Sequence, residues 1–202
     1  MVATVEFTEA VRRRRMVRRY RGTPVPRETI ERILEVARRA PSAGFSQGQR
    51  FVVVTEERLR LAIAALAGEE DHVVRGFEPW LTSAPVHIVV CVDGGAYRRR
   101  YASPDKAGSD PAEWPVPYPL VDAGASLMLL LLAAVDEGLG AGFLGAHRLA
   151  GIRSLLGIPL ESIVVGLVTL GPAAPDRPSG SLAAGWKPLD EVVHWEGWNA
   201  ED

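Results

Sequence analysis

Apolar residues recur along the chain with two different periods, which predict helices separated by short strands. After Pro26 the apolar positions fall at i, i+3, i+4 and i+7: Ile30, Ile33, Leu34 and Ala37. This spacing places four apolar side chains on one face of a helix, which Pro41 is expected to end. Runs rich in β-branched residues predict three strands, over residues 51–55, 86–92 and 163–171.

The segment 120–137 is apolar on nearly every side, which predicts a helix that is covered over most of its surface. Its charge-free part, 123–135, is shorter than a bilayer span requires, so we interpret it as a buried helix and expect no membrane partner. The glycine-rich stretch 138–145 leads into a further strand. These elements predict a single α+β domain over residues 1–202, with a mixed sheet of about four to five strands flanked by helices.

A long segment between the second predicted strand and this helix, residues 93–119, is rich in glycine and proline and is predicted to be irregular. A loop of this length inside a compact domain is usually functional. Its aromatic residues allow two interpretations. Either they form a lid over a bound ligand, or they only cover the core.

Composition narrows the class of protein. The chain has 202 residues, of which 25 are acidic and 23 basic, and this near balance predicts no nucleic-acid partner. The N-terminus lacks the apolar core of a signal peptide, which favours a soluble, cytoplasmic protein. The one cysteine, Cys91, excludes an intramolecular disulfide, and its apolar surroundings predict an inert thiol. The four histidines lack the spacing of metal ligands, so no metal site is predicted.

Seven arginines lie within the ten residues 12–21. Guanidinium groups match the geometry of phosphate oxygens, so an anion-binding site is one interpretation of this cluster. A solvated basic helix end, stabilised by the helix dipole, is a second, and contact with nucleic acid is a third. The residue pattern alone leaves all three open.

Two further segments combine small residues with the capacity to bind a flat ligand. Residues 40–51 join a helix to a strand, and Ser42 and Gln47 could add side-chain hydrogen bonds to a heterocycle, although a plain connecting loop is the alternative. The glycines of 138–145 follow a helix and enter a strand, which is not the order of a dinucleotide-binding phosphate loop. A helix cap followed by a buried strand accounts for most of this stretch, and the glycines still leave room for a ligand against the backbone.

In this order and at this spacing, these segments resemble the FMN-dependent nitroreductase family. Residues 14–18, Arg-Arg-Met-Val-Arg, are similar to the family's opening Arg-Arg-Ser-Val-Arg element, and residues 40–47 to its Ala-Pro-Ser-x-x-Asn-x-Gln loop. Residues 122–140 resemble its central dimer helix and the turn that follows, whereas 165–171 and 187–194 resemble its last strand and basic tail. The resemblance covers nearly the whole chain and rests on the ordered set of motifs.

The resemblance implies a nitroreductase-like fold and a homodimer, with the long helix at the interface and active sites shared between the subunits. The flavin carries the chemistry, so no catalytic side chain is implied. The implied FMN contacts are Arg14, Arg15, Met16 and Arg18 around the phosphate and ribityl chain, Pro41, Ser42, Ala43, Gly44 and Gln47 from the partner subunit, Leu144, Gly145 and Ala146 beside flavin N5, and Lys187 at the phosphate.

Several positions depart from the family's pattern. Met16 stands where the family usually has serine, Phe45 where it has asparagine, Gly48 where it has proline and Gln49 where it has tryptophan. Phe45 is therefore expected to present an aromatic face on the substrate side. Gly185 stands where some members carry a second tail cation, which leaves neutralisation of the phosphate to the N-terminal arginines.

The function that the resemblance implies is an FMN-dependent oxidoreductase. NAD(P)H would pass hydride to FMN, and a nitroaromatic, a quinone or another electron-poor small molecule would then accept the electrons. The same scaffold also serves flavin fragmentation, reductive dehalogenation and deazaflavin-linked chemistry. Outside enzymes, the alternative is a non-catalytic flavin-binding or anion-binding protein.

Overall fold

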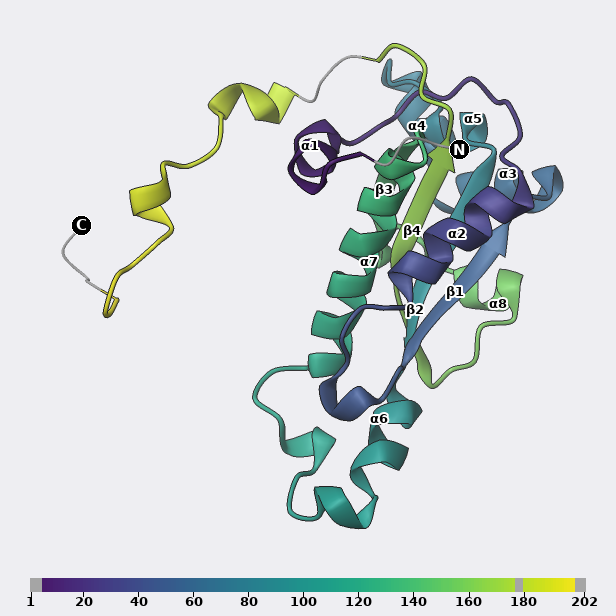
Figure 1. Ribbon diagram of the computed structural model, residues 1–202. Coiled ribbons are helices and arrows are strands. Elements are labelled where there is room, and N and C mark those ends of the chain that lie inside the picture. Colours follow the sequence, from purple (N-terminus) through teal and green to yellow (C-terminus); the bar gives the residue numbers. More distant parts are fainter. Residues whose placement is uncertain (1–4, 177–179, 199–202) are drawn as a thin grey trace.

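The computed structural model describes residues 5–176 and 180–198, and Figure 1 shows the arrangement of the elements. The strands are β1 (Gln49–Val54), β2 (Val86–Asp93), β3 (Gly140–Gly145) and β4 (Ser162–Gly171). The helices are α1 (Phe7–Arg13), α2 (Arg27–Ala37), α3 (Glu57–Leu66), α4 (Glu69–Val74), α5 (Trp80–Ser83), α6 (Gly94–Tyr101), α7 (Tyr118–Asp136) and α8 (Ile152–Leu156). Short 3-10 helices are η1 (Ala43–Phe45), η2 (Pro104–Lys106), η3 (Pro111–Glu113), η4 (Ala146–Arg148), η5 (Gly180–Ala184) and η6 (Leu189–Glu191).

The four strands form one sheet in the order β1-β2-β4-β3, and each neighbouring pair is antiparallel. β2 and β4 occupy the centre, which suits their β-branched sequences because side chains on both faces of these strands are packed. In the described residues, parallel pairing is confined to an isolated bridge between Met16 and Ala141. The predicted α+β fold, a sheet of four strands flanked by helices, is confirmed.

Helices cover both faces of the sheet and enclose two cores. On one face, α2 and α7 pack against the central strands, and this core includes Ile33, Ile88, Leu130 and Val168. On the other face, α3, α5 and α8 build a second core that includes Ile63, Leu81, Val89, Ile152 and Leu167. Helix α2 ends at Ala37, four residues before Pro41, and Ala37 is also its last residue in the first core.

Helix α7 is long and apolar enough, by length and composition alone, to cross a membrane. In the described chain one side of it packs into the first core, where the Ser126 hydroxyl donates to the Ala37 carbonyl at 2.7 Å. Of the 18 consecutive residues that are most apolar in this helix, 39% are buried. The sequence predicts a helix covered over most of its surface. Within this single chain, other residues cover α7 on one side only.

The prediction that residues 93–119 are irregular is wrong for its first part, which forms α6. Asp93 caps this helix by accepting the Ala96 N–H at 3.2 Å. The fully buried Tyr97 packs α6 against Val92 and Ala123. Two consecutive glycines at the helix start conceal it in the sequence, because glycine is unfavourable inside helices. The cap and the tertiary packing outweigh that local cost.

His87, on β2, is a buried titratable group remote from the predicted site. Its Nε2 donates to the Leu81 carbonyl at 2.9 Å, and its Nδ1 has no hydrogen-bond partner among the described residues. Burial lowers the pKa of His87 from 6.5 to about 4. The native protein therefore holds this imidazole neutral, while the unfolded chain would protonate it below pH 6.5.

This pKa shift predicts a loss of stability in acid. Between pH 6.5 and pH 4 the unfolded chain binds a proton at His87 that the native state does not, so the free energy of unfolding falls as the pH drops through this window. The full loss from this group is about 3 kcal/mol, since one pKa unit corresponds to about 1.4 kcal/mol. In His87→Gln, whose amide can still donate to Leu81, urea unfolding should depend less on pH across this window. An equal pH dependence of variant and wild type would contradict the assignment.

Candidate functional site

The loop over residues 42–48 has an unusual backbone. Gly44 (φ 60°), Phe45 (φ 57°) and Gln47 (φ 49°) all adopt the left-handed conformation. That region costs residues other than glycine on the order of 1 kcal/mol each, and such residues persist where the surrounding structure holds them. The loop therefore needs supports from the rest of the chain, and these can be identified.

Three hydrogen bonds hold the backbone of this loop. The Gln47 N–H donates to the Ser42 hydroxyl at 2.9 Å, which closes the loop on itself. The Ala43 N–H donates to the Asp122 carboxyl at 2.9 Å, and the Gly44 carbonyl accepts from Arg100 Nε at 2.7 Å. The loop is thus tied both to α7, through Asp122, and to α6, through Arg100.

Tyr97 connects these supports to the core. Its hydroxyl donates to the same Asp122 oxygen at 2.7 Å, and its burial together with the adjacent carboxyl raises the pKa of Tyr97, so the phenol keeps its proton. The ring lies directly against Gly48. A Cβ at position 48 would lie 2.4 Å from Tyr97 Cε2, which explains why glycine stands where the family usually has proline.

Aromatic residues of the segment 93–119 stand behind the loop. Trp114 packs edge-to-face on Tyr97, Tyr101 and Tyr118, with ring centroids 6.5, 4.7 and 5.3 Å apart. A Cβ at Gly44 would lie 2.9 Å from Tyr101 Cε2, so Tyr101 touches the loop backbone. The packing of Tyr97 and Trp114 agrees with the second of the two interpretations of this segment, in which its aromatic residues cover the core.

The predicted substrate contact, Phe45, projects from the loop. Its side chain is 74% exposed within the single chain. Gln47 and Pro41 are exposed as well. The loop therefore presents its own groups outward while its backbone is fixed from behind.

The arginine segment, residues 12–21, lies against β3. This strand is one edge of the sheet, and the loop 42–48 leads into β1 at the other edge. The Val17 N–H donates to the Ala141 carbonyl at 3.0 Å, and the Phe143 N–H donates to Met16 Sδ at 3.2 Å. A Cβ at Gly142 would lie 2.5 Å from the Val17 carbonyl oxygen. The room left by this glycine is thus occupied by the chain's own backbone, not by a ligand.

Asp176 joins the arginine segment to the chain beyond β4. Its side chain is 7% exposed, forms an ion pair with Arg15 and accepts the Arg18 N–H at 2.9 Å. Arg19 and Arg21 donate to the carbonyls of Pro175 and Ala173. Several of the seven arginines therefore fasten this segment to its own domain. Arg14 is half-buried, and the side chains of Arg15 and Arg18 remain exposed.

The other predicted contacts lie at two further places. Leu144, Gly145 and Ala146 are half-buried at the end of β3, the edge strand beside which the arginine segment runs, and Gly145 is paired with Gly166 of β4. Lys187 lies in the C-terminal segment, where it forms an ion pair with Glu191 at 3.4 Å. Figure 1 shows that segment leaving the body of the domain.

The predicted contacts thus form separate groups within one chain. The arginine segment and Leu144–Ala146 share the β3 edge, while the loop 42–48 runs into β1, the other edge of the sheet. Three strand spacings separate these edges, about 14 Å at about 4.8 Å per spacing. One chain therefore does not bring all the predicted contacts together.

Cys91 and the histidines take no part in this geometry. Burial raises the pKa of Cys91 to about 11, so the thiol stays protonated and inert, as predicted. Among the described residues no group of three or more potential ligands is placed to hold a metal ion.

Comparison with known proteins identifies the family. A family model described as the nitroreductase family matches residues 11–172. The chain belongs to the nitroreductase family. An NADH dehydrogenase of Thermus thermophilus is 32% identical, over 92% of this chain and 94% of its own length. A 4-nitrobenzoate reductase of Nocardioides is 29% identical, over 97% of this chain and 92% of its own length.

The fold comparison agrees with this assignment. The solved structure of an NADPH:FMN oxidoreductase from Vibrio harveyi, in complex with NAD+, is similar with a TM-score of 0.75 and 25% identity. The match covers 97% of this chain and 79% of that one. The predicted nitroreductase-like fold is therefore confirmed.

Two carboxylates that support the predicted contacts, Asp122 and Asp176, were not predicted from the sequence. Asp122 had a visible signal, because it is a charged residue at the start of an otherwise apolar helix. No such signal in the sequence marked Asp176, because it lies in a proline- and alanine-rich stretch after the last strand. Its role depends on where the chain beyond β4 meets the arginine segment.

Proposed function

We propose that this nitroreductase-family chain is an FMN-dependent oxidoreductase formed of a single FMN-binding domain. It takes electrons from NAD(P)H and performs the two-electron reduction of an electron-poor small molecule such as a nitroaromatic or a quinone. The observation that carries the proposal is the division of the predicted contacts between the two edges of the sheet, β3 and β1. A flavin placed between two copies of the chain would meet both sets.

The residues fit an FMN at both of its ends. Arg14, Arg15 and Arg18 lie within five residues beside the edge strand β3, and guanidinium groups bind phosphate through charge-assisted hydrogen bonds. The fixed loop 42–48 offers a rigid, small-residue surface to a flat ring, with Gln47 and Phe45 directed outward. When bound, the flavin would supply hydride chemistry, while these residues bind it, orient it and exclude water.

Asp176 determines which arginines are available to bind the phosphate. Because it neutralises much of the charge of Arg15, the residues left for direct phosphate contact are chiefly Arg14 and Arg18. Lys187 would reach the same phosphate from the tail of the chain. The half-buried Gly145 and its neighbours would lie beside flavin N5, further along β3.

The exposed apolar surface supports a homodimer with shared sites. Leu120, Val121 and Met128 are exposed on the side of α7 that faces away from its own core. Trp186 is 89% exposed on the C-terminal segment, and Trp195 and Trp198 are exposed near its end. Surfaces of this kind mark protein interfaces. A second copy that covers α7 and receives the tail would bury them and complete the site.

The proposal is tested on the purified protein. We expect it to bind FMN with a yellow colour, to sediment as a dimer, and to oxidise NADH or NADPH in the presence of a nitroaromatic or quinone acceptor. Steady-state rates with each nicotinamide identify the donor. A protein that takes up no added FMN would overturn the proposal. Bound FMN without turnover of either nicotinamide would favour the other chemistries of the scaffold.

A further inference from the structure

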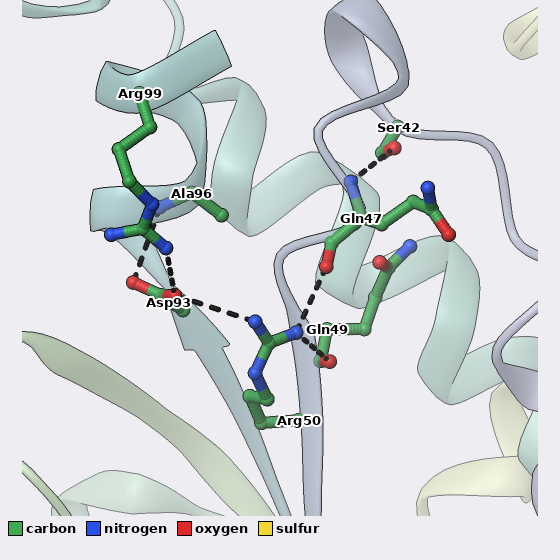
Figure 2. A network of polar contacts seen from close by, with 7 residues as sticks. All are labelled: Ser42, Gln47, Gln49, Arg50, Asp93, Ala96 and Arg99. Carbon is green, nitrogen blue, oxygen red and sulfur yellow. Dashed lines mark hydrogen bonds and ion pairs between the residues drawn. The ribbon is translucent and has the colours of Figure 1, made fainter.

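Arg50, at the start of β1, binds the loop 42–48 from the side that faces the sheet, as Figure 2 shows. Its Nη1 donates to the Gln47 carbonyl at 2.9 Å and to the Gln49 carbonyl at 2.8 Å. Its Nη2 reaches Asp93 Oδ2 at 3.4 Å. One guanidinium thus bridges the loop, its own strand and the neighbouring strand β2.

Asp93 is the centre of this network. Its carboxylate also accepts from Arg99 Nη2 at 2.9 Å and from the Ala96 N–H at 3.2 Å, while its backbone N–H donates to the Gly48 carbonyl at 2.8 Å. Burial would raise the pKa of Asp93, but the hydrogen bonds that its carboxylate accepts from Arg99 and the Ala96 N–H outweigh burial and lower it. Asp93 therefore remains ionised at neutral pH and can hold Arg50 in place.

The carbonyl that Arg50 binds belongs to a residue under backbone strain. Gln47 is a left-handed residue without the freedom of glycine, and its N–H is held by Ser42 on the other side. With both its N–H and its carbonyl held, the peptide groups on either side of Gln47 are fixed. In Figure 2 the Gln47 side chain points away from Arg50 and Asp93.

We propose that Arg50 is a positioning residue for the flavin-binding loop: supported by Asp93, it fixes the left-handed turn at Gln47 and so fixes where the Gln47 side chain meets the ring system. Because Asp93 also caps α6, the same network couples the loop to the aromatic segment behind it. This inference rests on the proposed function for its effect on flavin, but its effect on the loop is independent of any ligand.

The test compares Arg50→Ala with wild type by two measurements. In the protein without added flavin, hydrogen–deuterium exchange of peptides that cover residues 42–50 should become faster in the variant. In FMN titrations followed by flavin fluorescence, the variant should bind on the order of tenfold more weakly, as expected when a charge-assisted hydrogen bond is lost. At saturating FMN, the visible spectrum of the bound flavin should also change shape, because the ring meets a displaced loop.

Arg153→Ala is the matched control. Arg153 also donates through one Nη1 to two backbone carbonyls, those of Pro159 and Leu160, outside the loop and its supports. We expect this variant to leave exchange over 42–50 and the flavin spectrum unchanged. Arg50→Lys keeps the charge but loses the fork that reaches Asp93 and the carbonyls together, so its affinity and exchange should lie between those of wild type and Arg50→Ala.

The outcomes separate this inference from the proposed function. If wild type binds no FMN, the proposed function fails, and the exchange measurement alone decides whether Arg50 fixes the loop. If wild type binds FMN but Arg50→Ala retains its affinity, its bound spectrum and its exchange rates, Arg50 has no positioning role. Should Arg50→Ala not fold, the same comparisons on Arg50→Lys decide the question.

Discussion

Replacement of Asp122 with alanine is expected to lower the free energy of unfolding by about 3 kcal/mol and to weaken FMN binding strongly. The carboxyl accepts from the Ala43 N–H and from the hydroxyl of the fully buried Tyr97. Truncation leaves two donors without an acceptor, and a buried unsatisfied group costs about 1–3 kcal/mol. It also releases the loop 42–48 from α7. Urea unfolding of the flavin-free protein and an FMN titration measure the two effects.

Two variants separate the hydrogen bonds from the rest of the side chain. Asp122→Asn keeps an oxygen in the same place and should lose much less stability than Asp122→Ala. Tyr97→Phe removes one donor but leaves the Ala43 contact, so its cost should be about 1 kcal/mol, the usual net value of one hydrogen bond. If Asp122→Ala unfolded at the same urea concentration as wild type, Asp122 would not be the anchor of this loop.

Replacement of Arg18 with alanine is expected to weaken FMN binding by about 10- to 100-fold while changing riboflavin binding little. The exposed Arg18 side chain lies next to β3, and a hydrogen bond between charged groups contributes about 1.5–3 kcal/mol. Riboflavin lacks the phosphate, so the ratio of the two affinities reports contact with that group. Fluorescence titrations with both flavins, at low and high salt, measure the ratio and its screening.

Arg13→Ala is the control for the general positive charge of this region. Arg13 lies on α1, where it pairs with Glu9 one helical turn away. If long-range attraction to the whole cluster accounted for FMN affinity, both variants would lose it equally, and the loss would vanish at high salt. An equal loss of FMN and riboflavin in Arg18→Ala would instead place Arg18 away from the phosphate.

Edge position explains why the arginine segment and the loop could be recognised but not located from the sequence. Each is a local pattern of residue types, so its chemistry was visible: guanidinium groups in one, small and polar residues in the other. Their placement on β3 and on β1 depends on the strand order β1-β2-β4-β3, which no local pattern encodes. The division of the predicted site between two edges is therefore a result of the tertiary structure.

The glycines also show that local conformation is predictable from the sequence while contacts with distant residues are not. The glycines of 138–145 predicted a turn and a strand correctly, because φ freedom and β-structure are local properties. What occupies the space beside them was not predictable. At Gly142 it is the Val17 backbone, and at Gly48 it is the Tyr97 ring, and both come from distant parts of the chain.

Hydrophobic period and motif order are written in consecutive residues, so local patterns predict the strands of the sheet, the amphipathic helix α2, the apolar helix α7 and the family. The other features follow from the tertiary structure. It formed α6 over two glycines through the Asp93 cap and the burial of Tyr97. It set Asp122 behind the loop and Asp176 beside the arginines, because both roles need residues that are distant in sequence to meet in space.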